Sequence, residues 1–180
     1  SAADPRGEFK IDLSDDGYDD TVLGVVHSHP FGPAYPSKLD MAQQIASRLP
    51  WGIAVLQPHE DEGVFWLGGK PADLMIRPFR HGVTDCYGLV RDWYALHRGL
   101  VLIDRPRQWD WWNDGEDFYA ANFAKAGFTM LAEDAQLKIG DVGFASILSP
   151  VINHAVIWLG DGLILHHLAG RNGFDPSRLP

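Results

Sequence analysis

The sequence is poor in several features, and each shortage removes a class of protein. Cys86 is the single cysteine among 180 residues, so no disulfide can form within the chain and a functional cysteine must act as a free thiol. No apolar run reaches the roughly 18 residues that a membrane-spanning helix needs. Basic residues are outnumbered, with 15 Lys and Arg against 24 Asp and Glu, which argues against nucleic acid as the partner. No signal peptide is visible either, although the chain starts at Ser1 without Met.

What remains is the composition of a folded protein. The chain is 46% hydrophobic and 22% charged, and 180 residues suffice for one ordinary domain or two small ones. The segment Gly68-Gly69-Lys70-Pro71 has the residues of a linker. We therefore expect two α+β units, residues 1–70 and 71–180.

The first unit is predicted to alternate strands and a helix. The β-branched run Thr21–Val26 indicates a buried strand, and Ser37–Leu49 a helix that Pro50 ends. Two strands should follow, Gly52–Gln57 and Gly63–Leu67. The predicted buried face of the helix comprises Leu39, Ala42, Ile45, Ala46 and Leu49.

The second unit is predicted to place helices before strands. A helix should run from Asp85 to His97, with Gly99 as its stop and with Leu89, Val90, Trp93 and Leu96 buried. Another helix is expected from about Glu116 to Ala126. The predicted strands are Asp141–Ile147, His154–Leu159 and Leu163–Leu168, the last two joined by a turn at Gly160-Asp161-Gly162.

Two histidines and an aspartate follow the first predicted strand. Residues i and i+2 of a strand share a face, so His27 and His29 can point the same way. Asp40, at the start of the next helix, can bring a carboxylate to the same point. Three such ligands leave one zinc position open, which is the catalytic arrangement, and Ser37 could hydrogen-bond a water there. The competing interpretation is structural, because Ser37-x-x-Asp40 is also a helix-capping pattern.

The run His27-x-His29-Pro30, with Ser37-x-x-Asp40 after a spacer, resembles the JAMM/MPN metallopeptidase family. The resemblance implies that His27, His29 and Asp40 hold zinc. Enzymes of that family take a glutamate from an earlier strand as general acid/base, and Glu8 is the one glutamate upstream here. We therefore expect residues 1–70 to be the C-terminal part of such a domain and to be able to bind zinc, and the resemblance leaves open whether this part is a metallopeptidase.

The lone cysteine stands where a helix should begin. With Asp85 as N-cap, Cys86 falls in the first turn, where free N–H groups and the helix dipole favour a thiolate. His154, which opens a strand, can act as its base, and a third polar group should orient that imidazole. If Gly160-Asp161-Gly162 is a three-residue loop, His166 shares a face with His154; if only Asp161-Gly162 turns, His167 does.

A plain structural interpretation exists for these residues too, because a lone cysteine on an amphipathic helix usually fills core space. The motifs favour a site. Asp85-Cys86-x-Gly88-Leu89-Val90, Gly140-Asp141-Val142 and His154-x4-Leu159-Gly160-Asp161-Gly162 resemble the NlpC-type cysteine peptidases, a papain-like family of cell-wall endopeptidases. By its spacing from His154, His166 matches the third position of that family. The resemblance implies a helix bearing Cys86 packed on an antiparallel sheet bearing His154.

A more specific likeness covers most of the chain. The segment Arg77-Pro78-Phe79-x-His81-Gly82-Val83-x-Asp85-Cys86, the tryptophans between positions 109 and 112, and Pro150-x-x-Asn153-His154 resemble the tail-tip assembly proteins of lambda-like siphophages. Those proteins carry a JAMM domain followed by an NlpC-type domain. The resemblance implies a peptidase that cleaves peptidoglycan stem peptides next to diaminopimelate, other tail-tip proteins as partners, and a place in the virion tail tip or in the host cytoplasm during assembly. The alternative is an assembly factor that is non-catalytic or processes a tail protein.

Overall fold

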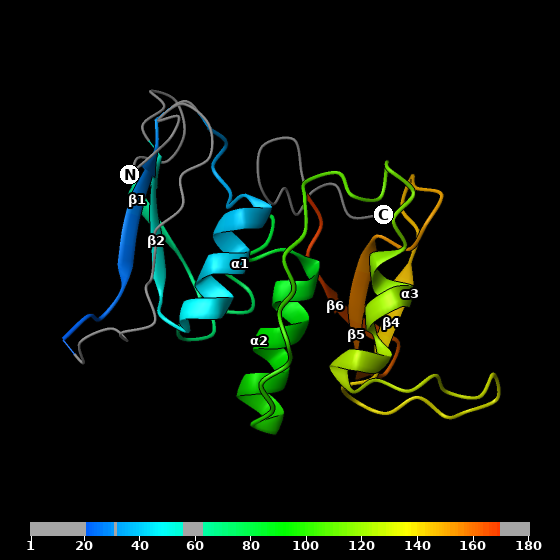
Figure 1. The fold of residues 1–180 in the computed structure, drawn as a ribbon. Coiled ribbons are helices and arrows are strands. Elements are labelled where there is room, and N and C mark those ends of the chain that lie inside the picture. Colours follow the sequence, from blue (N-terminus) through cyan, green and yellow to red (C-terminus); the bar gives the residue numbers. More distant parts are fainter. Residues whose placement is uncertain (1–20, 31, 56–62, 170–180) are drawn as a thin grey trace. The chain divides into compact units, whose positions relative to one another are not determined.

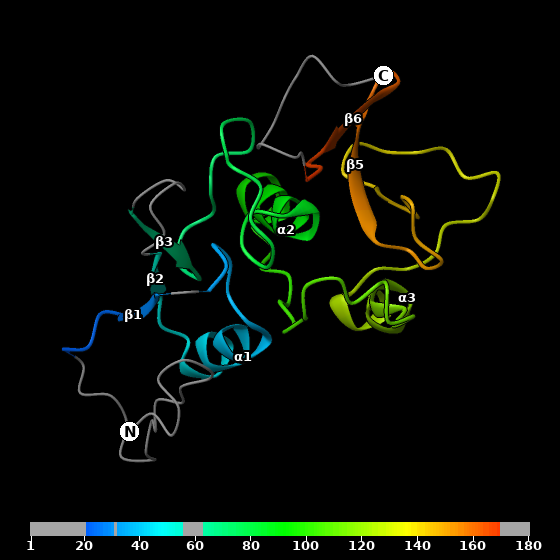
Figure 2. The ribbon, with the colours of Figure 1, turned by 90° about the horizontal axis from the view of Figure 1, so that it is seen from above.

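The computed structural model describes residues 21–30, 32–55 and 63–169. The chain divides into two compact units, one of residues 1–70 with Arg105–Arg107, the other of residues 71–104 and 108–180. Figures 1 and 2 show the elements of each unit. Both units combine helices with a small sheet, so the fold is α+β, as the residue patterns predict. In the described part of the chain, no helix is both long enough and apolar enough to cross a membrane.

The first unit is a three-stranded sheet with one helix. β1 (Val25–His29), β2 (Trp51–Val55) and β3 (Gly63–Leu67) lie in that order, with β1 parallel to β2 and β3 antiparallel to it. Parallel neighbours need a crossover, and α1 (Lys38–Ser47) provides it (Figures 1 and 2). The core contains the fully buried Trp51, Ile53 and Met41.

Two details of this unit differ from the prediction. β1 starts at Val25 and extends to His29, so both histidines lie within the strand and not after it. It is also an edge strand whose burial alternates, which leaves Val26 58% exposed. α1 ends at Arg48, which adopts a left-handed φ of 59°, and its deepest side chains are Asp40, Met41 and Gln43. The predicted apolar face of that helix was therefore wrong, because the helix turns its site residue inward.

The second unit packs helices on an antiparallel sheet. β4 (Val142–Ala145), β5 (His154–Gly160) and β6 (Leu163–His166) are neighbours in that order. α2 (Cys86–Arg98) packs against β5. α3 (Phe118–Asn122) is shorter than predicted and is followed by a 3-10 turn at Ala124–Ala126. The ring of Tyr119 on α3 lies 5.1 Å from that of Phe144 on β4, centroid to centroid, so α3 also contributes to this core.

α2 has the caps that its sequence predicts. The Asp85 side chain accepts a hydrogen bond from the Gly88 N–H, and Gly99 closes the helix in the left-handed conformation, with φ of 64°. Leu89, Val90 and Trp93 are buried. Leu96 is 55% exposed, contrary to prediction, because the last turn of the helix is exposed.

The hairpin of β5 and β6 reaches its register in an unexpected way. Gly160 pairs with Leu163, so only Asp161 and Gly162 form the turn. A bulge between Trp158 and Gly160 then takes up one residue, and Val156 pairs with His166. The two-residue turn alone would have placed His167 opposite Val156. The bulge reverses that parity and puts His166 on the face of His154.

Candidate functional site

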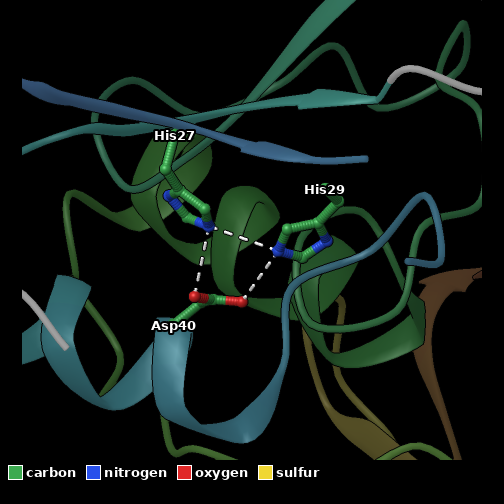
Figure 3. A group of neighbouring side chains, drawn as sticks. All are labelled: His27, His29 and Asp40. Atoms are coloured by element: carbon green, nitrogen blue, oxygen red, sulfur yellow. Dashed lines mark hydrogen bonds and ion pairs between the residues drawn. The ribbon is translucent and has the colours of Figure 1, made fainter. Parts of the chain in front are cut away.

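In the first unit, β1 and α1 bring His27, His29 and Asp40 together (Figure 3). The Nε2 atoms of the two histidines are 3.2 Å apart. Asp40 Oδ1 lies 3.2 Å from His27 Nε2, and Asp40 Oδ2 lies 3.3 Å from His29 Nε2. The strand sets two imidazoles on one face, and the first turn of the helix supplies the carboxylate, as the spacing predicts.

Neighbouring groups hold two of these side chains in place. His29 Nδ1 is 3.2 Å from the Pro33 carbonyl oxygen, and donating a proton there leaves its Nε2 lone pair directed at the cluster. Ser37 donates to Asp40 Oδ2 from its backbone N–H at 2.8 Å and from its hydroxyl at 2.7 Å. The Ser37 hydroxyl also caps α1 by accepting from the Asp40 N–H. The hydrogen bonds of the Ser37 hydroxyl described above are both to Asp40, and its predicted contact with a water stays a prediction.

The charges of the cluster suit a cation. Burial by itself raises the pKa of Asp40, but hydrogen bonds from His27, His29 and Ser37 outweigh burial and hold that pKa far below its ordinary value. The hydrogen bond to Asp40 in turn raises the pKa of His29, against the opposing effect of burial. An ionised, buried carboxylate therefore faces two imidazole nitrogens.

The cluster also has the dimensions of a zinc site. Ligands at about 2.0–2.1 Å from a tetrahedral zinc ion lie about 3.3–3.4 Å from one another. The separations of 3.2–3.3 Å among the donor atoms match that spacing. Two nitrogen lone pairs that converge on one carboxylate need a proton or a cation between them, so the residues present fit zinc.

In the second unit, the cysteine stands on a firmly held helix start. Asp85 is buried, and its carboxylate accepts hydrogen bonds from the N–H groups of Gly88 and Gly82, at 2.8 and 2.7 Å. Gly88 approaches Val83 so closely that a Cβ there would lie 2.3 Å from the Val83 carbonyl oxygen. These contacts fix the backbone on both sides of Cys86.

The thiol of Cys86 lies between α3 and the start of β5. Its Sγ is 3.3 Å from the Tyr119 hydroxyl and 3.9 Å from the backbone oxygen of Asn153, the residue before His154. The Asn153 side chain both accepts from the Ile147 N–H and donates to the Ile147 carbonyl, at 2.8 and 3.0 Å. Asn153 thereby closes the loop that leads into β5 and fixes where that strand begins.

Two of the predicted site histidines are in contact. His154 Nε2 lies 3.3 Å from His166 Nδ1, across β5 and β6. Burial, aided by the neighbouring His166 and His167, lowers the pKa of His154 to about 4. His154 is therefore neutral near pH 7, the form that accepts a proton. Because its Nε2 faces His166, its Nδ1 is the nitrogen that remains for a partner on the other side of the ring.

His167 is placed differently. Its Nδ1 lies 2.7 Å from the Thr84 carbonyl oxygen, where it donates a hydrogen bond, and its ring meets Phe79 edge to face. It is buried and ties the end of the last strand to the segment just before α2. Of the two histidines left open by the sequence, the structure brings His166 to His154 and His167 to the backbone of Thr84.

Comparison with known protein families also divides the chain into two parts. The model of the NlpC/P60 family matches residues 65–179, and that of the prokaryotic homologs of the JAB domain matches residues 2–73. The chain belongs to the NlpC/P60 family. Of the residues described above, Cys86, His154 and His166 fall in the NlpC/P60 region of the chain. His27, His29 and Asp40 fall in the JAB-like region.

Two relatives are named as tail-tip proteins. The chain is 38% identical to the tail tip assembly protein K of Escherichia phage lambda over 148 residues, which cover 82% of this chain and 70% of the relative. It is 36% identical to the protein of that name in Escherichia phage N15, over 83% of this chain and 61% of the relative. No solved structure gives a significant match. The chain is thus of the tail-tip assembly type, with a JAB-like domain followed by an NlpC/P60 domain.

Tyr119 is the site residue that the sequence did not reveal. It stands in the aromatic-rich α3, 33 residues from Cys86, with no spacing or motif that links it to the thiol. The packing of its ring among Tyr87, Trp111, Phe118 and Phe144 directs its hydroxyl to the sulfur.

Proposed function

We propose that this tail-tip protein is a cysteine peptidase with Cys86 as nucleophile, His154 as base and His166 as the group that orients the base. The observation that carries the proposal is the meeting of three parts of the chain: Cys86 at the capped start of α2, the Asn153 backbone oxygen just before β5 at 3.9 Å from its sulfur, and His166 on β6 at 3.3 Å from His154. Membership of the NlpC/P60 family supports the same chemistry.

The reaction proceeds in two steps. His154 takes the thiol proton on Nδ1 as Cys86 Sγ attacks the peptide carbonyl, and it then donates that proton to the leaving amine. Water, deprotonated by the same imidazole, releases the acyl group from sulfur and restores the thiol. The contact from Nε2 to His166 holds the ring in one orientation throughout, which is the task of the third member in such an arrangement.

The substrate we propose is the peptidoglycan stem peptide, cleaved at the bond between D-glutamate and diaminopimelate. The support is the resemblance to cell-wall endopeptidases of the NlpC type and the tail-tip names of the relatives. A tail-tip enzyme would act on the wall during infection, or in the host cytoplasm during assembly, and other phage tail proteins would be its partners.

We further propose that His27, His29 and Asp40 bind zinc. Zinc held by three protein ligands in this way supplies Lewis-acid chemistry when bound. In this chain, Ser37 and the Pro33 carbonyl orient the ligands, and burial keeps the carboxylate of Asp40 away from competing water. Glu8, the glutamate upstream, lies outside the described residues.

Digestion of purified peptidoglycan tests the proposed function. The chain and its Cys86→Ala variant are incubated with sacculi, and the released muropeptides are identified by mass spectrometry. We expect the wild type to release fragments cut at the D-glutamyl-diaminopimelate bond and the variant to release none, while thermal unfolding of the two stays similar because only one sulfur is removed.

Equal cleavage by wild type and variant would disprove the nucleophile. Absence of cleavage by the wild type, combined with slow alkylation of Cys86 by iodoacetamide near pH 6, would favour the alternative of a non-catalytic assembly factor. If the chain cleaves a tail protein and not sacculi, the proposed cysteine peptidase mechanism stands and the proposed stem-peptide substrate is wrong.

A further inference from the structure

The surroundings of Cys86 must stabilise the negative charge of a thiolate. The thiol is only 8% exposed, so a thiolate formed there loses most of its contact with water and needs hydrogen-bond donors from the protein. Two of its neighbours work against a negative charge. Asp85, the preceding residue, carries a buried carboxylate, and the Asn153 carbonyl oxygen at 3.9 Å is an acceptor.

The start of α2 supplies only part of the hydrogen bonding that a thiolate at Cys86 needs. Of its backbone N–H groups, that of Gly88 is already donated to Asp85. The neighbouring imidazole is also no standing cation, because burial keeps His154 neutral near pH 7. Among the titratable groups, Tyr119 contacts the thiol, Asp85 precedes Cys86 in the chain, and His154 follows Asn153, whose carbonyl oxygen lies 3.9 Å from the sulfur. His166 contacts His154, His81 pairs with Asp85, and His167 bonds to the Thr84 carbonyl.

We propose that Tyr119 is a further catalytic residue, whose hydroxyl donates a hydrogen bond to the Cys86 sulfur and stabilises the thiolate. The hydroxyl lies 3.3 Å from Sγ, within hydrogen-bond distance for sulfur. This inference rests on the proposed function, since it assigns a residue to the same nucleophile. Hydrogen bonds to a charged acceptor are about twice as strong as neutral ones, so the bond strengthens when the thiol loses its proton.

The position of Tyr119 is rigid, which makes the hydrogen bond effective. Its side chain is 7% exposed and is surrounded by the rings of Tyr87, Trp111, Phe118 and Phe144, at centroid distances of 6.2, 5.7, 6.3 and 5.1 Å. The cap at Asp117, which accepts from the Ala120 N–H, fixes the start of the short helix. The hydroxyl therefore stays at the sulfur without an entropic cost at each turnover.

The test is the pH dependence of thiol alkylation. Only the thiolate reacts with iodoacetamide, so the alkylation rate of Cys86, the single cysteine, follows its ionisation directly. The experiment compares wild type with Tyr119→Phe, which keeps the ring and removes the hydroxyl. We expect the midpoint of the pH–rate curve to rise by roughly one pH unit in the variant, the size of one charge-assisted hydrogen bond.

Two control variants separate this effect from general damage. Tyr94→Phe removes a hydroxyl that donates to the Gly140 carbonyl, also in this unit, and should leave the midpoint unchanged. Trp111→Phe disturbs the packing around Tyr119 but keeps its hydroxyl, so a shift in that variant equal to that of Tyr119→Phe would assign the effect to packing. Thermal unfolding of each variant shows whether it is folded.

An unchanged or lowered midpoint in Tyr119→Phe would overturn the inference. Because alkylation needs no peptidase activity, its result is independent of the proposed function. If the midpoint rises but the wild type cleaves no peptidoglycan, Tyr119 stands as the hydrogen-bond donor to the thiolate and the proposed substrate is wrong. If the wild type cleaves peptidoglycan but the midpoint does not shift, the substrate stands and the role of Tyr119 is wrong.

Discussion

Two neighbouring histidines at the end of the last strand, His166 and His167, have different surroundings. The side chain of His166 turns toward His154, which lies 3.3 Å away. That of His167 turns the other way and bonds to the Thr84 carbonyl, two residues before Cys86. Successive side chains of a strand point to opposite faces. His166 therefore orients the proposed base, whereas His167 supports the backbone at Thr84.

This division predicts opposite effects of two alanine substitutions. His166→Ala should lower kcat by about a hundredfold or more, because the base loses its orienting contact, and should change the unfolding temperature little. His167→Ala should cost about 1–3 kcal/mol of stability, because it leaves a buried carbonyl without its donor, and should affect kcat far less. Peptidoglycan cleavage rates and thermal unfolding of both variants measure these effects.

His97→Ala serves as control, since that imidazole lies in the exposed last turn of α2 and should change neither quantity. Equal losses of kcat in His166→Ala and His167→Ala, or a larger loss in the second, would contradict the assignment of roles.

At the scale of residues, the sequence predicted which side chains converge better than it predicted their surroundings. His27, His29 and Asp40 converge as their spacing predicted, because strand parity and a capping pattern are local rules. Tyr119 was missed, since the contact between a tyrosine and a cysteine 33 positions away depends on packing that no local rule contains. Strand periodicity alone left His166 and His167 undecided, because a bulge leaves no clear mark in the residue pattern, whereas the spacing of the family resemblance pointed to His166.

At the scale of elements, α2 depends on a close approach of backbone to backbone. Gly88 lies in its first turn, against the carbonyl of Val83, and a side chain at that point would meet this oxygen at 2.3 Å. The glycine of the motif Asp-Cys-x-Gly thus has a steric cause: it lets the segment before the helix fold back and place Asp85 as cap.

We therefore expect Gly88→Ala to destabilise the second unit, by a few kcal/mol, since a backbone atom cannot move aside as a flexible side chain can. The variant should also lose activity, because Cys86 precedes the displaced turn. Chemical denaturation measures the first effect and peptidoglycan cleavage the second.

The matched control is Gly63→Ala in β3, where a Cβ would meet nothing within 4 Å. Stability of Gly88→Ala equal to that of the control would show that the segment around Val83 can move and that the tight approach has no structural role.

The elements themselves were predictable to different degrees. α2 was found with its cap and its stop, because Asp85 and Gly99 are strong terminal signals. α3 was predicted too long, since its second half tightens into a 3-10 turn at Ala124–Ala126 that closes at Gly127, whose φ is 91°. The start of β1 was misplaced because Thr21 and Val22 satisfy the strand pattern, whereas the pairing of β1 with its neighbour β2 begins only at Val25.

At the scale of the whole molecule, each compact unit holds one constellation. The proposed zinc ligands lie in residues 27–40 of the first unit, and the thiol and the histidines proposed to act with it lie in residues 86–166 of the second. The two constellations share no residue. We therefore expect the peptidase rate to be independent of the metal.

Chelation tests this expectation. Treatment with a chelator should leave peptidoglycan cleavage largely unchanged, while emission spectrometry should show less zinc in His29→Ala than in wild type, because one of three ligands is gone. Stoichiometric zinc in His29→Ala would place the metal elsewhere. Loss of cleavage on chelation, restored by zinc, would show that the two units work as one.

The bulge in β5 has a consequence for the evolution of the chain. A one-residue deletion inside a strand normally inverts every side chain beyond it. Removing Leu159 would instead join Trp158 to Gly160 and leave a regular hairpin, in which Gly160 still meets Leu163 and Val156 still meets His166. The hairpin thus contains one position, Leu159, whose deletion leaves each side chain of the strands on its present face. The chain can therefore lose this one residue without moving the histidine that faces the base.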